Sequence, residues 1–154
     1  MRIVLLSDTH GFLDDALVAS CRDCDEIWHA GDFGTAEVLD VLKEIGTVRA
    51  VFGNVDGAEV RSQVPEDLEW ECEGVTVFMT HIARKGPRRD LSIAGHSHIL
   101  KVARDERGTL HMNPGACGHH GWHQKRTLLR FTLSSGKISG VEAVELGPRG
   151  RKKS

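Results

Sequence analysis

Metal-binding side chains follow a run of apolar residues close to the start of the chain. The segment IVLLSDTHG places Asp8 and His10 directly after the apolar residues 3–6. An apolar run of this length predicts a buried strand. If the strand continued, its two-residue side-chain period would point Asp8 and His10 to the same side. The pattern predicts two metal ligands from one segment; an ordinary turn is the alternative, since Ser, Asp and Gly favour turns.

Similar side chains end four other apolar segments. EIWHAGD ends in Asp32, VRAVFGN in Asn54, VTVFMTH in His81, and LSIAGHSH in His96 and His98. Open parallel sheets bind ligands outside the carboxyl ends of their strands. One such residue by itself is weak evidence, but the whole set predicts a metal centre at one edge of a sheet.

The types and number of these residues narrow the choice of metal. Mixed carboxylate, imidazole and amide ligands suit Mn, Fe, Co, Ni or Zn, whereas a set made of carboxylates would favour Mg or Ca. Seven candidate ligands exceed what one tetrahedral ion needs, and two ions bridged by a carboxylate fit better. Two metals about 3.5–4 Å apart serve in-line displacement at phosphorus. The prediction is two divalent ions, manganese first, with nickel, iron, cobalt or zinc as alternatives.

Helical and strand patterns alternate in the first third of the chain. Strands are expected at 2–7, 26–32 and 48–54, and helices at 13–22 and 35–46, the second with Thr35 as its N-cap. This order implies a parallel sheet. The later part reads as a hairpin around Gly74, flanked by 68–73 and 75–81, and then as short strands at 91–98, 99–105, 109–115, 127–134 and 137–146. The expected fold class is α/β (α+β): two packed mixed sheets with helices outside.

Composition sets further bounds. The chain has 154 residues, 40% hydrophobic residues and a formal net charge of −2, which favours one domain over 1–148 with a basic tail at 149–154. No run approaches the roughly 18 apolar residues of a membrane helix, and no signal-peptide pattern opens the chain, so a cytoplasmic location is expected. The CRDC pair, Cys21 and Cys24, lacks a second pair and is interpreted as reduced structural residues rather than a zinc or redox site.

The motifs SDTHG, HAGD, FGNVD, MTH, AGHSH and NPGA resemble, in this order, those of the calcineurin-like metallophosphoesterases. They look most like the small single-domain bacterial and archaeal phosphodiesterases of that superfamily. The resemblance runs from residue 3 to about residue 133. It implies the metallophosphoesterase fold, a four-layer α/β/β/α sandwich, and a phosphodiesterase in which a hydroxide shared by two metals attacks phosphorus in line.

The resemblance also implies a role for each motif residue. The first metal would be held by Asp8, His10 and His98. The second would be held by Asn54, His81 and His96, and Asp32 would bridge the two. Three of these would serve the reaction through the metals and the shared hydroxide: Asp32, Asn54 and His98. Four further residues are candidates for contacts behind the metals or to substrate: Asp56, Asn113, His119 and His120. Asp56 could instead be a turn residue, and the two histidines, one of which could act as a general acid or bind phosphate, could instead belong to a surface glycine-rich loop.

The chain departs from the family pattern in two places. Many larger members have His after Gly-Asn, where this chain has Val55; the small phosphodiesterases often lack that His too. The family usually has a helix between the strand ending in "TH" and the GHxH motif, whereas 82–95 is short here. Parallel crossovers normally need a dozen or more residues. Either the helix is lost, which would expose a sheet face and favour a homodimer, or the segment lacks residues.

Two other functions compete with a phosphodiesterase for small substrates. A retromer subunit resembles the same fold and acts mainly as a binding scaffold with altered metal motifs, but none of the seven positions is altered here. A nuclease is the second alternative. The net charge of −2, with basic clusters only at 84–89 and 149–153, argues against nucleic acid as partner.

Overall fold

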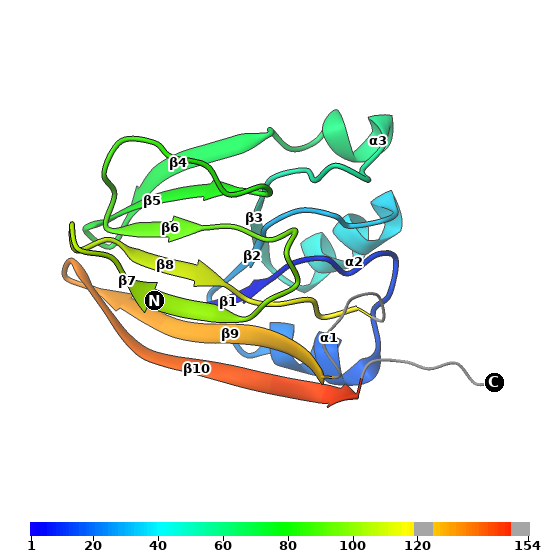
Figure 1. The fold of residues 1–154 in the computed structure, drawn as a ribbon. Helices are drawn as coiled ribbons and strands as arrows, with labels where there is room; N and C mark the ends of the chain where they lie inside the picture. Colours follow the sequence, from blue (N-terminus) through cyan, green and yellow to red (C-terminus); the bar gives the residue numbers. More distant parts are fainter. Residues whose placement is uncertain (119–124, 149–154) are drawn as a thin grey trace.

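The computed structural model describes residues 1–118 and 125–148, which form two five-stranded sheets (Figure 1). The first sheet has the order β10-β9-β1-β2-β3, and the second has the order β4-β5-β6-β8-β7. The first contains β1 (Arg2–Leu6), β2 (Glu26–His29), β3 (Thr47–Ala50), β9 (Lys125–Ser134) and β10 (Lys137–Pro148). The second contains β4 (Asp67–Cys72), β5 (Val75–Thr80), β6 (Leu91–Ile93), β7 (Lys101–Arg104) and β8 (Leu110–Asn113).

Strand pairing confirms the expected topology. β1, β2 and β3 pair in parallel, as the alternation of strands and helices predicts. β4 and β5 form the antiparallel hairpin around Gly74, and β9 and β10 form a second hairpin through the turn at 135–136. β5, β6 and β8 pair in parallel, so both sheets are mixed and their parallel strands end at the same side of the molecule.

Two helices cover the outer face of the first sheet (Figure 1). They are α1 (Asp15–Arg22) and α2 (Ala36–Ile45), and a short α3 (Ala58–Arg61) follows β3. The Asp14 side chain caps α1 by accepting the Leu17 amide at 3.0 Å. Thr35 is the N-cap of α2, but its side chain makes no capping hydrogen bond. Leu17 and Leu39 pack against Leu6 in the cluster beneath these helices. Among the described residues, no helix is long and apolar enough to cross a membrane.

The main core lies between the two sheets. Ile3 and Leu5 of β1 point into it, while Val4 and Leu6 point to the helices. Because both faces of β1 are buried, its sequence is a continuous apolar run instead of an alternating one. Trp28 lies at the centre, in edge-to-face contact with other aromatic rings, and its indole N–H donates to Glu26 at 3.0 Å.

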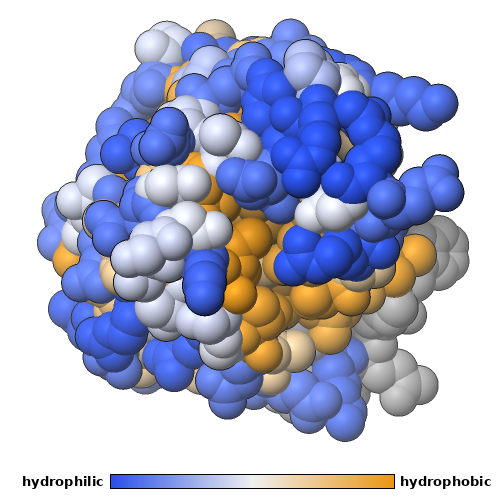
Figure 2. Space-filling view, turned by 90° about the vertical axis from the view of Figure 1, so that its left-hand side faces the viewer, coloured by the Kyte–Doolittle hydropathy of each residue, from blue (hydrophilic) through white to orange (hydrophobic). Residues whose placement is uncertain are grey.

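Within residues 1–118 and 125–148, no helix covers the outer face of the second sheet. The connection from β5 to β6, residues 81–90, contains no helix, yet β5 and β6 pair in parallel. The expected fold class is therefore confirmed: two packed mixed sheets with helices outside. The helices of the described residues lie beside the first sheet (Figure 1). Figure 2 shows hydrophobic side chains gathered between strongly hydrophilic ones on one side of the molecule.

Candidate metal centre

Loops at the carboxyl ends of neighbouring strands hold one another in place. The Asp8 amide donates to the Gly31 carbonyl at 2.9 Å, which joins the loops after β1 and β2. The Gly95 amide donates to the His81 carbonyl at 2.9 Å, which joins the loops after β5 and β6. The two sheets thus bring all five predicted segments to one edge, as expected from parallel strands.

Five candidate ligands have left-handed backbone conformations. The φ angles are 56° for Asp8, 49° for His10, 61° for Asp32, 67° for His96 and 63° for His98. Non-glycine residues rarely adopt these angles, which cost about 1–3 kcal/mol each and concentrate at functional sites. The strand does not continue beyond Leu6, so side-chain alternation is not what brings the first two residues together.

The first group of side chains comprises Asp8, His10 and His98, whose ligand atoms lie within 4.8 Å of one another. The Asp8 Oδ1 atom is 3.2 Å from Nε2 of His98 and 3.6 Å from Nε2 of His10. Asp8 is fully buried and both histidines are partly buried. One carboxylate and two imidazoles converging from two loops can hold a divalent transition metal.

The second group comprises Asp32, His81 and His96, again within 4.8 Å. Asn54 joins it, because its Oδ1 atom lies 3.1 Å from Nδ1 of His96. The Asp32 Oδ2 atom is 3.1 Å from Nε2 of His81 and 3.8 Å from Nε2 of His10. This carboxylate oxygen therefore lies between the two groups, where a bridging ligand must be.

Hydrogen bonds from the surrounding backbone orient these side chains. Asp8 uses Oδ2 to accept from the Ser7 hydroxyl at 2.6 Å and the His96 amide at 3.1 Å, which leaves Oδ1 facing the histidines. Asp32 uses Oδ1 to accept from the Val55 amide at 3.1 Å, which leaves Oδ2 facing the site. His81 Nδ1 donates to the Ala30 carbonyl at 2.8 Å, so the lone pair of Nε2 faces the site.

These residues fit a pair of metal ions. Asp8 Oδ1 and His81 Nε2 are buried, and neither makes a hydrogen bond of normal geometry with a described residue. Buried polar atoms are almost always satisfied, and a coordinated cation satisfies both a carboxylate oxygen and an imidazole nitrogen. The seven predicted ligand residues therefore surround a place where ions are needed; that they bind metal remains a prediction.

The charged groups of the site depend on one another. Burial by itself raises the pKa of Asp8, but the neighbouring histidines and the Ser7 hydroxyl outweigh it and hold this pKa well below its usual range. The Asp8 carboxylate raises the pKa of His10. Burial lowers the pKa of His81, and the adjacent Asp32 carboxylate more than reverses this. The carboxylates and these two imidazoles thus favour each other's charged forms, and a bound cation would compete with the imidazole protons.

Asp56 lies behind the centre and joins two of its loops. It is 3% exposed. Its Oδ2 accepts from the amides of Asp32 at 3.0 Å and Gly53 at 2.8 Å, and its Oδ1 accepts from the Gly34 amide at 3.1 Å. Asp56 therefore fixes the backbone beside Asp32 and Asn54. It is not merely a turn residue.

We expect Asp56→Asn to loosen the metal centre without removing a ligand. The amide replaces one accepting oxygen with a donor that faces backbone N–H groups. Losing such a supporting contact costs about 10–100-fold in metal affinity. Isothermal titration of the metal-free variant with Mn²⁺ measures this, with the exposed Asp40→Asn as control. An affinity equal to that of the unmodified protein would show that Asp56 has no positioning role.

Asn113 holds the loop that carries His96 and His98. Its side-chain amide donates to the Gly95 carbonyl at 2.9 Å and to the Ser97 hydroxyl at 3.1 Å, and its carbonyl accepts from the Gly115 amide at 3.0 Å. These contacts place it as a loop-positioning residue; a contact to substrate stays a prediction. His119 and His120 lie outside the described residues, as does the basic tail 149–154.

His29 is a buried histidine that the sequence did not single out. Its Nδ1 accepts from the Gly31 amide at 3.1 Å, so Nε2 carries the proton and donates to the Thr9 hydroxyl at 3.1 Å. Thr9 in turn donates to the Phe33 carbonyl at 3.0 Å. This chain ties the loops after β1 and β2 beneath the ligands. The only signal for this role in the sequence was the position of His29 directly before the residues AGD. A histidine in a buried strand is otherwise not distinguishable from any other core residue.

The pKa of His29 predicts how stability depends on pH. Burial lowers this pKa from 6.5 to about 3. Below pH 6.5 the unfolded state gains a proton that the folded state cannot hold until about pH 3. The contribution of His29 therefore falls by up to about 1.4 kcal/mol per pH unit across this window, and is constant above it.

Urea unfolding at pH 7 and pH 5 tests this expectation with His29→Gln as the comparison. The difference in unfolding free energy between the unmodified protein and the variant is expected to shrink by about 2 kcal/mol on acidification. A difference that stays constant between the two pH values would contradict a neutral, buried His29.

The two cysteines of the CRDC pair do not form a separate site. Cys21 is buried and Cys24 is partly buried, and the Cys24 thiol donates to the Cys21 carbonyl at 3.2 Å. Burial raises the pKa of Cys21 to about 12. The thiol is therefore a poor metal ligand, which agrees with the structural interpretation.

Comparison with known proteins identifies the family. Residues 1–136 match the model of the calcineurin-like phosphoesterase superfamily domain. A probable metallophosphoesterase of Methanocaldococcus jannaschii is 30% identical over 135 residues, which cover 75% of this chain and 68% of that protein. One of Methanothermobacter thermautotrophicus is 28% identical over 134 residues, covering 75% and 77%.

Solved structures share the fold. Vps29 of Entamoeba histolytica, complexed with zinc, has a TM-score of 0.75 at 15% identity and covers 96% of this chain and 100% of its own. YfcE, a phosphoesterase from Escherichia coli, has a TM-score of 0.64 at 21% identity and covers 92% and 98%. The chain belongs to the calcineurin-like phosphoesterase superfamily.

Proposed function

We propose that the protein is a phosphodiesterase that uses two divalent metal ions, manganese foremost, on a small phosphodiester in the cytoplasm. One observation carries the proposal: two groups of three ligand side chains meet at Asp32 Oδ2, which lies 3.1 Å from Nε2 of His81 in its own group and 3.8 Å from Nε2 of His10 in the other. When bound, the ions would lower the pKa of a water between them and neutralise charge on the phosphoryl oxygens. Nickel, iron, cobalt and zinc are compatible with the same ligands.

The protein's own residues would prepare the reaction. Asp8 and Asp32 present one free carboxylate oxygen each because backbone and hydroxyl donors occupy the other. His81 is held in one tautomer by Ala30. Asn54 projects a neutral amide oxygen beside His96, where it can contact either the second ion or the phosphate. Side chains that are already held in position before the substrate binds lower the free-energy cost of reaching the transition state.

Hydrolysis of bis-p-nitrophenyl phosphate tests the proposal. The protein is stripped of metal, resupplied with Mn²⁺, Ni²⁺, Co²⁺, Zn²⁺ or Mg²⁺, and compared on the diester and on p-nitrophenyl phosphate. Metal-dependent cleavage of the diester, lost in Asn54→Ala and His81→Ala, is the expected result. Turnover of the monoester alone would replace the phosphodiesterase by a phosphomonoesterase.

A binding scaffold is the second candidate. It is supported by the fold shared with Vps29 and by the uncovered outer face of the second sheet. Two ions bound per chain without turnover of either ester, together with a stable complex or homodimer, would favour the scaffold. The complete set of seven ligand residues favours the enzyme, since a scaffold gains nothing from keeping all of them.

A further inference from the structure

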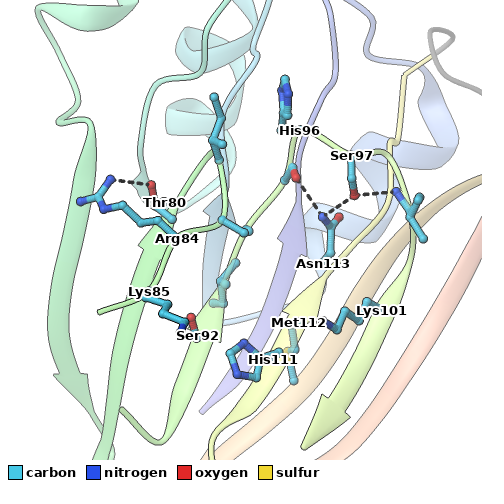
Figure 3. A pocket seen from close by; sticks show the side chains of 16 residues that line it. Thr80, Arg84, Lys85, Ser92, His96, Ser97, Lys101, His111, Met112 and Asn113 are labelled. Carbon is cyan, nitrogen blue, oxygen red and sulfur yellow. Dashed lines mark hydrogen bonds between the residues drawn. The ribbon is translucent and has the colours of Figure 1, made fainter. Parts of the chain in front are cut away.

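A pocket of about 630 Å³ lies on the uncovered outer face of the second sheet. Its floor is formed by residues 92–94, at and after β6, and by Met112 of β8. One wall is the short connection after β5, residues 82–85, and the other wall is the segment that leads to Lys101 (Figure 3). The pocket thus exists because none of the helices in the described part of the chain covers this part of the sheet.

The pocket is continuous with the candidate metal centre. His96, a predicted ligand of the second ion, lies at its upper end, next to Ser97 (Figure 3). A smaller hollow lined by Asn54 and His81 shares three residues with the pocket: Thr80, Ile82 and Arg84. A group esterified to a phosphate at the metal centre would therefore lead directly into the pocket.

The floor and rim of the pocket differ in character. Ala94 contributes apolar surface to the floor, whereas the Met112 side chain is 2% exposed and belongs to the core between the sheets, and Ile82 and Ile99 stand half-exposed at the rim. Ligand sites of about 300–1,000 Å³ typically combine apolar walls with a few placed polar groups. From residue 92 to residue 96 an extended chain covers about 13 Å, enough for a nucleoside-sized group.

Two lysines supply positive charge that is not already used. Arg84 is paired with Asp67, and Arg89 with Glu69. The side chains of Lys85 and Lys101, in contrast, form no ion pair or hydrogen bond with a residue in the described ranges, and Figure 3 shows them on opposite sides of the pocket. A second anionic group on the ligand would be attracted to both.

We infer that this pocket binds one ester group of the substrate, and that the substrate is a nucleotide-like phosphodiester carrying a second phosphate. The inference rests on the proposed phosphodiesterase function. The flat, largely apolar base and sugar would lie on the floor formed by β6 and β8. The second phosphate would lie between Lys85 and Lys101.

Three substrates that release p-nitrophenol test the inference with one assay. They are bis-p-nitrophenyl phosphate, thymidine 5′-(p-nitrophenyl phosphate), and the same compound with a 3′-phosphate. We expect kcat/KM to rise from the first to the third. Ser92→Trp, which fills the pocket from its floor, is expected to lower kcat/KM for both thymidine compounds by at least about tenfold. Its effect on bis-p-nitrophenyl phosphate, which carries no nucleoside, is expected to be smaller.

The lysines are tested separately. Lys101→Glu is expected to remove the gain from the 3′-phosphate, about fivefold, so that the two thymidine compounds are cleaved with similar kcat/KM. Ser139→Trp and Lys137→Glu, both exposed on β10, are matched controls that should change nothing. The inference would be overturned if Ser92→Trp lowered kcat/KM equally for all three substrates. It would also be overturned if the unmodified protein did not prefer the thymidine compounds to bis-p-nitrophenyl phosphate.

A binding measurement separates this inference from the proposed activity. Thymidine 3′,5′-bisphosphate is titrated into metal-free protein by calorimetry, and binding is expected to be lost in Ser92→Trp but kept in Ser139→Trp. Binding without turnover of any diester would contradict the proposed phosphodiesterase activity but would support the pocket as a binding site. The inference would be overturned if the bisphosphate did not bind and the unmodified protein self-associated, with Ser92→Trp abolishing that self-association. The outer face of the second sheet would then be a protein interface.

Discussion

Asp32→Asn is expected to lower kcat/KM for bis-p-nitrophenyl phosphate by about 1,000-fold or more, equivalent to about 4 kcal/mol of transition-state stabilisation. The Val55 amide donates to Asp32 Oδ1, so the amide oxygen of the new side chain would take that position. Its NH₂ group would then occupy the place of Oδ2, between His10 and His81. In the proposed two-metal centre, a donor would then face the two ions at the position where the carboxylate is expected to bridge them.

Metal content distinguishes this explanation from a folding defect. The variant is expected to bind fewer than two ions per chain, measured by elemental analysis after gel filtration, while its circular dichroism spectrum stays unchanged. Asp40→Asn, on the exposed side of α2, is the matched control and should keep both activity and metal. Two bound ions and activity within about tenfold of the unmodified protein would refute the bridging role.

The order of apolar segments was enough to predict both sheets, because the apolar residues of each segment indicate which of its faces are buried. β1 is apolar on both faces since helices and a second sheet cover it. From the resemblance to known motifs, the seven ligand residues were expected to lie close together, and they do so in the structure. The outer layer of the second sheet was not predictable from the family pattern, since it depends on the length of one connection.

The sequence could not predict how the ligands are presented. Asp8 and His10 were expected to share a side through strand alternation, but the strand ends at Leu6 and both residues have positive φ. Such conformations are fixed by contacts with distant loops, such as the bond from the Asp8 amide to Gly31. The roles of His29 and Ser7 were missed for the same reason: their partners lie on other segments or depend on exact backbone direction.

Gly34→Ala is expected to destabilise the protein by about 3–5 kcal/mol and to weaken metal binding together with it. Gly34 has a φ of +89°, and a Cβ atom there would lie 2.3 Å from the Gly11 nitrogen and 2.5 Å from the His10 carbonyl carbon. Both obstacles are backbone, so the loop that presents His10 must shift. Gly86→Ala is the control, because its Cβ would meet nothing within 4 Å. Urea unfolding of the metal-free proteins measures the difference; equal stability of the two variants would show that the loops after β1 and β2 need no such close approach.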